Sequence, residues 1–471
     1  MKASECKTME KKITNKAVNI EKVGTALTAS GIFKATTKTI TSGSFAKQLT
    51  TDNCTYLISG AFDLKDEVVT LPKNATLYFK PGGSLSNGTL VGQNGCIVAE
   101  RKVFDRIHIE GSWCCIGNAG WWAEGTTDVE KPNNEYVGLQ SALDSSFSEL
   151  VFPPAKFYTG STLTINNPKR IVLQGVRTRW PLSWDKSVCN TTIVFTDKNI
   201  HLLTVNLDDN GKYNTVEITG GNFDTSLCPN YTSSCIRVLA DDCQKIWGLK
   251  ISTNLMGKFS SVTGVGIDLN PIYNEKAAPN TAFITNVRID SDISYFGTGV
   301  RAVQWGDNKN WLTDVYIDGN IRFCPCAIDT SAGGTFTASL QAGAYYSEQQ
   351  NNAALIVIRG GKTSVAIGCA IYDIYAGDKD SGKWSNRYAV WVEDQNGGDH
   401  TQDSSVTLSC ATIVPFGRFE AFLIGSNFHH VSFIKGRAKI PVMKDIYFNG
   451  GTTPEKSASV LVYGDELYNK V

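Results

Sequence analysis

The chain has 471 residues, with 45 basic and 45 acidic side chains, so its formal net charge at pH 7 is zero. A protein that binds nucleic acid usually carries a basic excess, so this balance argues against a nucleic acid partner. No run of about 18 apolar residues occurs, so we expect neither a membrane-spanning helix nor a membrane partner. The 43 glycines and the many Thr, Ser and Asn residues favour short strands joined by turns over long amphipathic helices.

Thirteen cysteines are scattered along the chain, and no two have the Cys-x-x-Cys spacing. Cys324 and Cys326 flank a proline and have no nearby His or Cys to complete a four-ligand zinc site, so we expect no metal and no cofactor. The odd number favours buried, reduced thiols that pack as small apolar side chains. Reduced thiols, and an N-terminus that continues into Lys and Glu without an apolar stretch, predict assembly in a reducing cytoplasm without a signal peptide.

The first segment, residues 1–55, is rich in Lys, Thr, Ser and Ala and has few large apolar side chains. Such a segment cannot bury enough apolar surface to fold as a domain by itself. Two interpretations stay open: a leader without fixed structure, and an attachment arm that becomes ordered against a partner. We divide the rest of the chain into a small β-rich entry module at 56–130, a shaft at 131–435 and a C-terminal β cap at 436–471.

From residue 55 onward a short pattern recurs, in which two apolar residues flank one outward-facing residue and a turn rich in Gly, Asn or Asp follows. This alternation is typical of a half-buried strand, and copies lie about 15 to 45 residues apart, as in a solenoid with loop insertions. The linkers are too long for hairpins and too poor in helix formers for βαβ units, so we expect an all-β parallel β-helix. Copies include residues 216–218, 249–251, 287–289, 315–317, 356–358 and 390–392.

One helix is expected after Asn134, because Tyr136, Leu139 and Leu143 follow that capping residue at helical spacing. The helix precedes the strand-like stretch 150–152. A short amphipathic helix in this place covers the open end of a β-solenoid, whose exposed strand edge would otherwise template aggregation.

Residues 134–143 and 151–158 resemble the capping helix and first strand of pectate-lyase-like proteins, although Ala155 stands where glycine is usual. Residues 163–165 and 171–175 resemble the next two strands. Residues 71–90 resemble a module found in β-helical proteins of gut phages and bacteria. Over about a quarter of its length, the chain is therefore similar to the pectate-lyase-like right-handed parallel β-helix superfamily, of the phage tailspike or tail fibre type.

This resemblance implies a right-handed, single-stranded parallel β-helix with a short capping α-helix and an N-terminal attachment arm. Tailspikes are trimeric virion proteins that bind, and often cleave, surface polysaccharide. The resemblance thus implies a homotrimer located in the virion, a host surface glycan as partner, and docking to other virion tail or capsid proteins through residues 1–55. The polygalacturonase motifs Asn-Thr-Asp, Gly-His-Gly and Arg-Ile-Lys are absent from the sequence.

Candidate catalytic residues follow from the alternation. Asp290 and Asp318 each follow an inward apolar pair, so their side chains point outward, and stacked coils would bring their backbones about 4.8 Å apart. Two carboxyl groups at about 5 Å suit a retaining glycosidase. The alternative is that these are solvated surface charges with little energetic effect. In the same register we expect one column, made of Asp290, Asp318, Arg359 and Glu393.

Aromatic side chains on or beside the same coils are candidates for binding sugar, because sugar rings pack their C–H faces on flat aromatic surfaces. Tryptophans in solenoid loops also serve local packing, and that alternative stays open. The candidate substrate-binding residues, with Arg359 from the charged column, are Trp305, Trp311, Tyr316, Trp384 and Trp391.

The sequence thus predicts a structural virion protein, a bacteriophage tail spike or fibre, that binds a host cell-surface polysaccharide along its β-helix. The alternative is a polysaccharide depolymerase on the same scaffold, with a glycoside hydrolase favoured over a lyase because nothing singles out the base that a lyase requires. A secreted bacterial glycan-active protein is a third class, and it would need an export signal.

Overall fold

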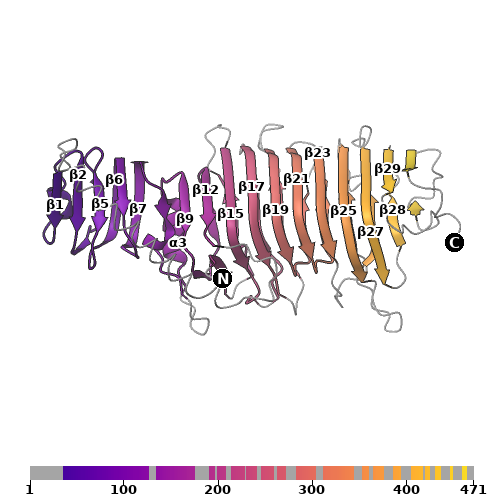
Figure 1. The fold of residues 1–471 in the computed structure, drawn as a ribbon, viewed down its shortest axis with the longest axis horizontal. Coiled ribbons are helices and arrows are strands. Elements are labelled where there is room, and N and C mark those ends of the chain that lie inside the picture. The colour runs from indigo at the N-terminus through magenta and orange to yellow at the C-terminus, as the bar shows by residue number, and fades with distance from the viewer. Residues whose placement is uncertain are drawn as a thin grey trace, which may run out of the picture. The chain divides into compact units, whose positions relative to one another are not determined.

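The structure is a computed structural model and forms two compact units, Met1–Cys115 and Ile116–Val471. Strands dominate both units (Figure 1). The structure describes residues 36–126, 134–175, 190–196, 199–207, 214–228, 230–240, 245–258, 263–271, 283–303, 311–331, 333–343, 353–359, 364–375, 386–393, 405–416, 420–424, 430–435, 446–448 and 459–463.

The first unit contains one 7-stranded sheet whose described strand pairs are all parallel. Side chains alternate between the core and the surface along each strand, and Tyr56, Leu77 and Ile107 are completely buried. Its elements are β1 (Thr36–Ile40), α2 (Phe45–Gln48), β2 (Cys54–Ile58), β3 (Ala61–Asp63), β4 (Val68–Thr70), β5 (Thr76–Phe79), β6 (Ser84–Val98) and β7 (Phe104–Trp113).

Asparagines fix one corner of successive coils in this unit. Asn53, Asn74 and Asn94 have φ values of 52°, 55° and 58°, a left-handed conformation that asparagine tolerates better than most residues. The Asn74 amide donates to the Asn53 side-chain oxygen at 2.8 Å, and the Asn94 amide donates to that of Asn74 at 2.7 Å. The stacked amides therefore hold neighbouring coils in register.

The boundary that the sequence placed at residue 55 lies within this unit. Strand β1 (Thr36–Ile40) pairs in register with β2 (Cys54–Ile58), so residues 36–40 belong to the strand stack. Residues 1–35 lie outside the described residues. Attachment through this segment stays a prediction.

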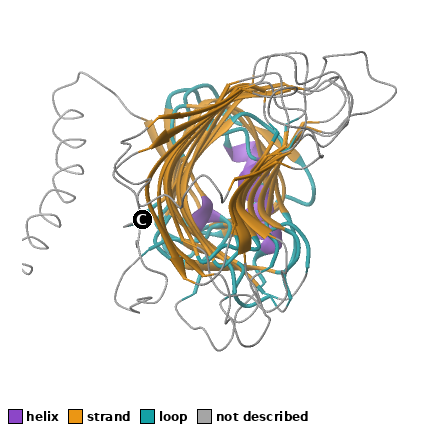
Figure 2. Ribbon diagram, turned by 90° about the vertical axis from the view of Figure 1, so that its right-hand side faces the viewer, coloured by secondary structure: helices purple, strands orange, loops and turns teal. Residues whose placement is uncertain are grey.

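The second unit forms a 14-stranded and a 10-stranded sheet, and all their described strand pairs are parallel. Seen along the stack in Figure 2, the strands form curved walls around an interior. The 14-stranded sheet contains β8 (Gly117–Asn118), β9 (Glu149–Phe152), β10 (Lys156–Thr159), β12 (Lys169–Leu173), β13 (Thr192–Phe195), β15 (Asn214–Asp224), β17 (Lys245–Met256), β19 (Phe283–Ser294), β21 (Trp311–Arg322), β23 (Gly333–Gly343), β25 (Ser364–Tyr375), β27 (Ser405–Phe416), β29 (His430–Lys435) and β31 (Ser459–Tyr463).

The strands of the two sheets alternate along most of the chain, so that each coil from β14 onward contributes one strand to each sheet. This arrangement is a parallel β-helix, which confirms the fold that the spaced repeats predicted. The 10-stranded sheet contains β11 (Leu163–Ile165), β14 (Leu203–Asn206), β16 (Ser234–Ala240), β18 (Val265–Pro271), β20 (Thr298–Ala302), β22 (Cys326–Thr330), β24 (Ala353–Arg359), β26 (Asn386–Glu393), β28 (Glu420–Ile424) and β30 (Ile446–Phe448).

Stacked aliphatic side chains form the core of this unit. In the 14-stranded sheet Val216, Leu249 and Val287 occupy one column of register partners, and each is at most 2% exposed. Each buried Val or Leu side chain contributes about 1.5–3 kcal/mol relative to an exposed one. Repetition of small apolar contacts from coil to coil thus replaces the single compact centre of a globular domain.

The expected capping helix is present as α3 (Tyr136–Asp144), which follows the short 3₁₀ turn η1 (Ala119–Trp121). Its apolar side chains Leu139, Ala142 and Leu143 are buried, and it contacts β11. Its N-cap position is Glu135, but the Asn134 side-chain oxygen accepts the Tyr136 N–H at 3.1 Å. The asparagine therefore serves the helix start, as its place in the sequence predicted.

A second row of polar side chains runs along the 14-stranded sheet, almost out of contact with water. The Asn254 amide donates to Asn222 at 3.2 Å, and the Asn320 amide donates to Asp292 at 2.6 Å. The three asparagines are at most 9% exposed. Buried polar groups are tolerated when they are hydrogen-bonded, so these contacts align neighbouring coils.

The region expected as a C-terminal β cap, residues 436–471, has two described strands. Strands β30 and β31 pair in parallel with β28 and β29 and extend the two sheets by one strand each. Among the described residues, no helix has the length and apolar character needed to cross a membrane.

Candidate functional site

Charged side chains occupy one column of the 14-stranded sheet, on the face that points away from the core. Each is the register partner of the next, from β9 through β12, β15 and β17 to β19. The column ends at Tyr316 on β21, the partner of Arg288. We name these side chains the charged row: Glu149, Arg170, Glu217, Lys250 and Arg288.

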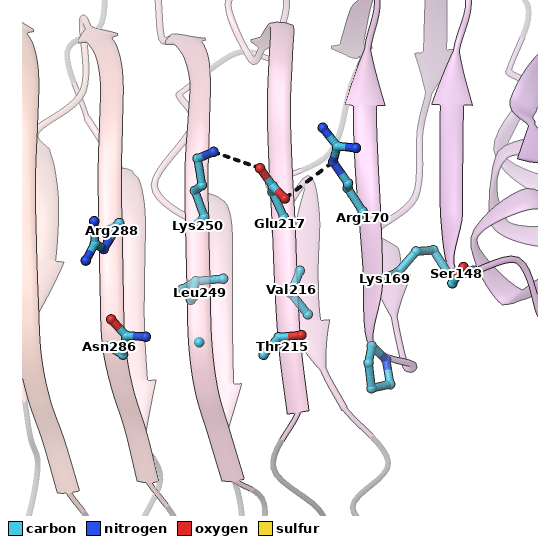
Figure 3. Close-up of a pocket in the computed structure, with 12 residues that line it drawn as sticks. Ser148, Lys169, Arg170, Thr215, Val216, Glu217, Leu249, Lys250, Asn286 and Arg288 are labelled. Carbon is cyan, nitrogen blue, oxygen red and sulfur yellow. Dashed lines mark hydrogen bonds and ion pairs between the residues drawn. The ribbon is translucent and has the colours of Figure 1, made fainter. Parts of the chain in front are cut away.

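Ion pairs connect four of the five members of the charged row. Arg170 contacts the carboxylate of Glu149 at 3.1 Å and that of Glu217 at 3.3 Å. Glu217 also accepts a hydrogen bond from Lys250 Nζ at 2.8 Å, and Figure 3 shows the two contacts of Glu217 side by side. Exposed pairs of this kind contribute about 0–1 kcal/mol, so a ligand can exchange them at little cost.

Arg288 differs from the other two cations of the row. Its guanidinium carbon lies 5.8 Å from the ring centroid of Tyr316, a cation–π contact, and within the described part of the chain it has no carboxylate partner. The Tyr316 ring positions the Arg288 guanidinium, whose N–H groups stay available to bind a ligand. Of the cations in the row, Arg288 is therefore the best placed to accept an anionic group from solution.

The charged row borders a shallow hollow of about 440 Å³. Thr215 and Asn286, both exposed, add hydroxyl and amide groups to its lining (Figure 3). Near it on the same sheet are Trp247, next to the lining residue Gly248 and 48% exposed, and Tyr316, which is 40% exposed. The hollow thus combines cations, neutral hydrogen-bonding groups and nearby aromatic surfaces.

Lys169 also lines the hollow but is only 4% exposed. Its Nζ donates to the carbonyl oxygen of Ser145, the C-cap residue of α3, at 2.5 Å, where a cation also interacts favourably with the helix dipole. Burial lowers the pKa of this amine to about 8, and the charge of nearby Asp144 opposes that shift. Lys169 therefore links strand β12 to the C-terminal end of the capping helix α3.

The expected stacking of Asp290 and Asp318 is confirmed. They are direct register partners on β19 and β21, both are exposed, and the Ser252 hydroxyl donates to the Asp290 carboxylate at 3.3 Å. We name them the carboxylate pair. Asp290 lies two residues after Arg288, and Asp318 lies two residues after Tyr316. The carboxylate pair and the Arg288–Tyr316 contact therefore lie on the same outer face. A catalytic role for the pair stays a prediction.

The expected column of four residues is wrong, because its members belong to two sheets. Asp318 has Ser339 as its next partner in the 14-stranded sheet, whereas Arg359 and Glu393 are partners of each other on β24 and β26 of the 10-stranded sheet. Each coil supplies a strand to both sheets. The next two apolar repeats, at 356–358 and 390–392, lie in the 10-stranded sheet, so the pattern in the sequence changed sheets without a visible break.

The remaining candidates are placed only in part. Trp305 and Trp384 lie outside the described residues. Trp311 is the register partner of Phe283, and Trp391 that of Val357, but neither side chain is among those described, and the same holds for Arg359 and Glu393. Tyr316 is therefore the one candidate sugar-binding side chain whose surroundings the described structure gives.

Sequence reasoning did not single out Arg170, Lys250 and Arg288 as a binding site. A signal was present, because Lys250 and Arg288 are the central residues of the repeats 249–251 and 287–289. Read in chain order, the central residues of four successive repeats are Glu217, Lys250, Arg288 and Tyr316. Arg170 was hidden because the strand expected at 171–175 begins one residue after it, whereas β12 (Lys169–Leu173) includes Arg170 and pairs it with Glu217.

A second column, in which bases and acids alternate, lies on the 10-stranded sheet, and its central carboxylate is buried. Asp268 is 2% exposed and accepts two hydrogen bonds from Arg301, at 2.9 Å to Nε and 2.6 Å to an Nη. This contact raises the pKa of the Arg301 guanidinium. We name this column the covered row: Arg237, Asp268, Arg301 and Asp329.

His201 lies beside the covered row. Its Nδ1 accepts the backbone N–H of Ser234 at 3.1 Å, and its Nε2 lies 3.2 Å from an Arg237 Nη. Burial, followed by the charge of Arg237, lowers the pKa of this imidazole. These neighbours favour the neutral ring, which suits packing in a structural cluster.

No group of three or more His, Cys, Asp or Glu side chains that could hold a metal ion occurs among the residues that the structure describes. In comparisons with protein-family models, curated proteins and solved structures, nothing matches this chain.

Proposed function

We propose that this protein binds an extended, anionic polysaccharide across the outer face of the 14-stranded sheet, over strands β12 to β21. The observation that carries the proposal is the hollow beside the charged row, with exposed aromatic side chains on the same sheet. Strands β12 to β21 are separated by four inter-strand steps of about 4.8 Å, so this part of the sheet face is about 19 Å long. A surface of that length contacts several consecutive sugar units.

Binding of sugar is supported by the mixture of groups around the hollow. Exposed Trp247 and Tyr316 offer flat faces on which sugar C–H groups pack, and Thr215 and Asn286 offer hydrogen bonds to hydroxyl groups. The strands position these groups on a rigid scaffold, so little conformational entropy is lost when a ligand binds.

The preference for an anionic ligand follows from the charges. Around the hollow the cations Arg170, Lys250 and Arg288 face only one lining carboxylate, that of Glu217. Arginine forms paired hydrogen bonds with carboxylate or sulfate groups, and Arg288 has no such partner in the described structure. A uronate or sulfated sugar at this position gives Arg288 the anion that the protein does not supply.

The proposal is tested by isothermal titration calorimetry of the full chain with polygalacturonate and, as the neutral comparison, dextran. We expect the anionic chain to bind and the neutral chain to bind at least tenfold more weakly. Arg288→Ala should weaken binding about tenfold, the effect of one charge-assisted hydrogen bond. Lys250→Ala combined with Arg288→Ala should weaken it about a hundredfold.

Lys80→Ala is the matched control, since Lys80 is an exposed cation of the first unit and its replacement should leave affinity unchanged. Equal loss in Lys80→Ala and Arg288→Ala would mean that net charge alone attracts the glycan. Absence of binding to polygalacturonate and to a sulfated glycan such as heparin would overturn the proposal.

A depolymerase on the same face is the second candidate, favoured by the register of the carboxylate pair. One protonated carboxyl group would donate to the leaving oxygen while the other attacks the sugar or activates water. Incubation with a bound glycan should then release reducing ends, and Asp290→Asn combined with Asp318→Asn should abolish that release. Absorbance of an unsaturated uronate would indicate a lyase instead, and unchanged hydrolysis in the double variant would discard the pair.

The biological setting that we propose is a bacteriophage tail spike or fibre that docks through residues 1–55 and holds a host surface polysaccharide as a homotrimer. The support is the resemblance of residues 134–143 and 151–158 to pectate-lyase-like β-helices, a family that includes tailspikes, together with the parallel coils. Light scattering of the full chain should give three times the mass of one chain. A clean monomer would contradict the spike, while leaving the glycan test unaffected.

A further inference from the structure

Three thiols come together near the end of the first unit. Cys96 lies in β6 (Ser84–Val98), and Cys114 and Cys115 directly follow β7 (Phe104–Trp113). Because Gly95 and Trp113 are register partners, Cys96 and Cys114 occupy the next position on the two neighbouring strands. The Cys114 N–H donates to the Gly95 carbonyl at 2.8 Å and continues the pairing past the strand end. We name Cys96, Cys114 and Cys115 the thiol cluster.

The contacts within the thiol cluster give each sulfur a different role. The Cys115 sulfur accepts the backbone N–H of Ile97 at 3.2 Å, whereas the Cys96 thiol donates to the Ile97 carbonyl at 3.9 Å. The Cys114 thiol instead donates to the Gly95 carbonyl at 3.2 Å. Cys115 is thus the acceptor, and its sulfur is the one prepared to carry negative charge.

These hydrogen bonds have the expected effect on acidity. The contacts with Cys96 and Ile97 outweigh burial and lower the pKa of Cys115 to about 7, while the contact with Cys115, followed by burial, raises the pKa of Cys96. A thiolate, not a thiol, attacks disulfides and electrophiles. Of these two thiols, Cys115 is therefore the more readily deprotonated one, and Cys96 is its protonated neighbour.

The thiol cluster is also accessible, which distinguishes it from the other cysteines whose burial the structure describes. Cys114 is exposed, and Cys96 and Cys115 are partly exposed. The rest fit the expectation of buried thiols that pack as small apolar side chains: Cys54, Cys228, Cys235, Cys324 and Cys326.

We propose that Cys115 and Cys96 form a thiol–disulfide exchange site that reacts with small-molecule disulfides. The Cys115 thiolate attacks one sulfur of the disulfide RSSR, forming a mixed disulfide and releasing RS⁻. Cys96 then gives up its proton and attacks the Cys115 sulfur, forming a Cys96–Cys115 disulfide and releasing a second RS⁻. The protein is oxidised by two electrons, RSSR is reduced to two RSH, and the second proton comes from solvent.

The position of the Cys115 sulfur favours this bond. The Ile97 N–H that this sulfur accepts at 3.2 Å belongs to the residue directly after Cys96, so the sulfur lies beside the Cys96 backbone. The bond would tie the segment that leaves the first unit, at Cys115, to strand β6.

The test treats the reduced, full-length chain with oxidised glutathione and maps the products by peptide mass spectrometry. We expect a Cys96–Cys115 disulfide and two released glutathione molecules per chain. In Cys96→Ser the second step is impossible, so glutathione should stay attached to Cys115. Cys114→Ser is the matched control and should react as the wild type does.

A second measurement needs no exchange partner. Under limiting iodoacetamide at pH 7, Cys115 should be alkylated at least tenfold faster than the buried Cys54 and Cys235, and Cys96→Ser should slow it. A predominant Cys96–Cys114 bond, or alkylation of Cys115 no faster than that of Cys54, would overturn the proposal. Neither readout depends on glycan binding.

Discussion

The charged row and the covered row both place acids beside bases on outer strand faces of the second unit, yet the two rows differ in their exposure to water. Arg170 and Lys250 of the charged row expose 50% and 53% of their side chains. In the covered row, Asp268 exposes 3% of its side chain and Arg301 33%. Ion pairs between neighbouring coils therefore occur in two electrostatic environments.

The difference shows how one repeat pattern serves two purposes. In water an ion pair contributes little and is easily exchanged, so the charged row is free to take a ligand. Where water is excluded, a charge without its partner is costly, so Asp268 and Arg301 stay paired and hold neighbouring coils together. Exposure, rather than the sequence of charges, decides which row can bind.

The largest expected effect is the loss of the buried carboxylate. Asp268→Asn removes the charge that faces Arg301, and breaking a buried pair costs about 3–5 kcal/mol. Because a third of the Arg301 side chain is exposed to water, we expect the free energy of unfolding to fall by about 3 kcal/mol, the lower end of this range. Urea denaturation of the full chain, followed by circular dichroism, measures this loss. A loss below 1 kcal/mol would remove the contrast between the two rows.

The next effect concerns pH and Lys169. Its pKa of about 8 in the folded chain is lower than the ordinary 10.5, so between these values the unfolded chain binds more protons and stability rises with pH. The free energy of unfolding should rise by about 2–3 kcal/mol between pH 7.5 and 10.5. Lys169→Met should lack this part of the rise in urea denaturation between pH 7.5 and 10.5. Identical slopes for both proteins would mean that the amine is not buried in solution.

A smaller effect is expected when the aromatic ring that contacts Arg288 is removed. Tyr316→Ala removes the cation–π contact to Arg288 and a flat surface for sugar, and we expect affinity for polygalacturonate to fall about fivefold. Tyr316→Phe retains the ring and should bind within about twofold of the wild type. Calorimetry decides between them. A loss in Tyr316→Phe equal to that in Tyr316→Ala would assign the effect to the hydroxyl group.

The smallest effect is expected for the exposed counterpart of Asp268. Glu217→Gln removes the carboxylate shared by Arg170 and Lys250, and the loss of stability should stay below about 1 kcal/mol. Affinity for the anionic glycan should rise about two- to threefold, because Lys250 loses its carboxylate partner and Arg170 keeps only that of Glu149. A stability loss comparable to that of Asp268→Asn would show that exposure does not separate the two rows.

Several local features could be predicted because they depend on neighbours in the chain. Asn134 and the helical spacing of Leu139 and Leu143 marked α3 to within a few residues. Alternation of apolar and outward residues identified the strands around Val287 and Val315, and the partnership of Asp290 with Asp318 followed, because those two coils are consecutive and lack a large insertion.

Other features could not be predicted, because they depend on which strands become neighbours. The repeats at 356–358 and 390–392 look like those at 287–289 and 315–317, but they lie in the other sheet, so Arg359 and Glu393 do not continue the carboxylate pair. The approach of Cys115 to Cys96 was likewise hidden by the intervening chain.

The sequence by itself determined that this protein builds parallel coils from short strands with one capping helix, since alternation, turn residues and capping are written within a few consecutive residues. Only the tertiary structure decided the register of one coil on the next, the assignment of each strand to a sheet, and the degree to which each charge is covered. The physical reason is that hydrogen bonds between coils, and the exclusion of water from some outward positions, involve residues about 20 to 40 positions apart, a distance over which no local pattern carries information.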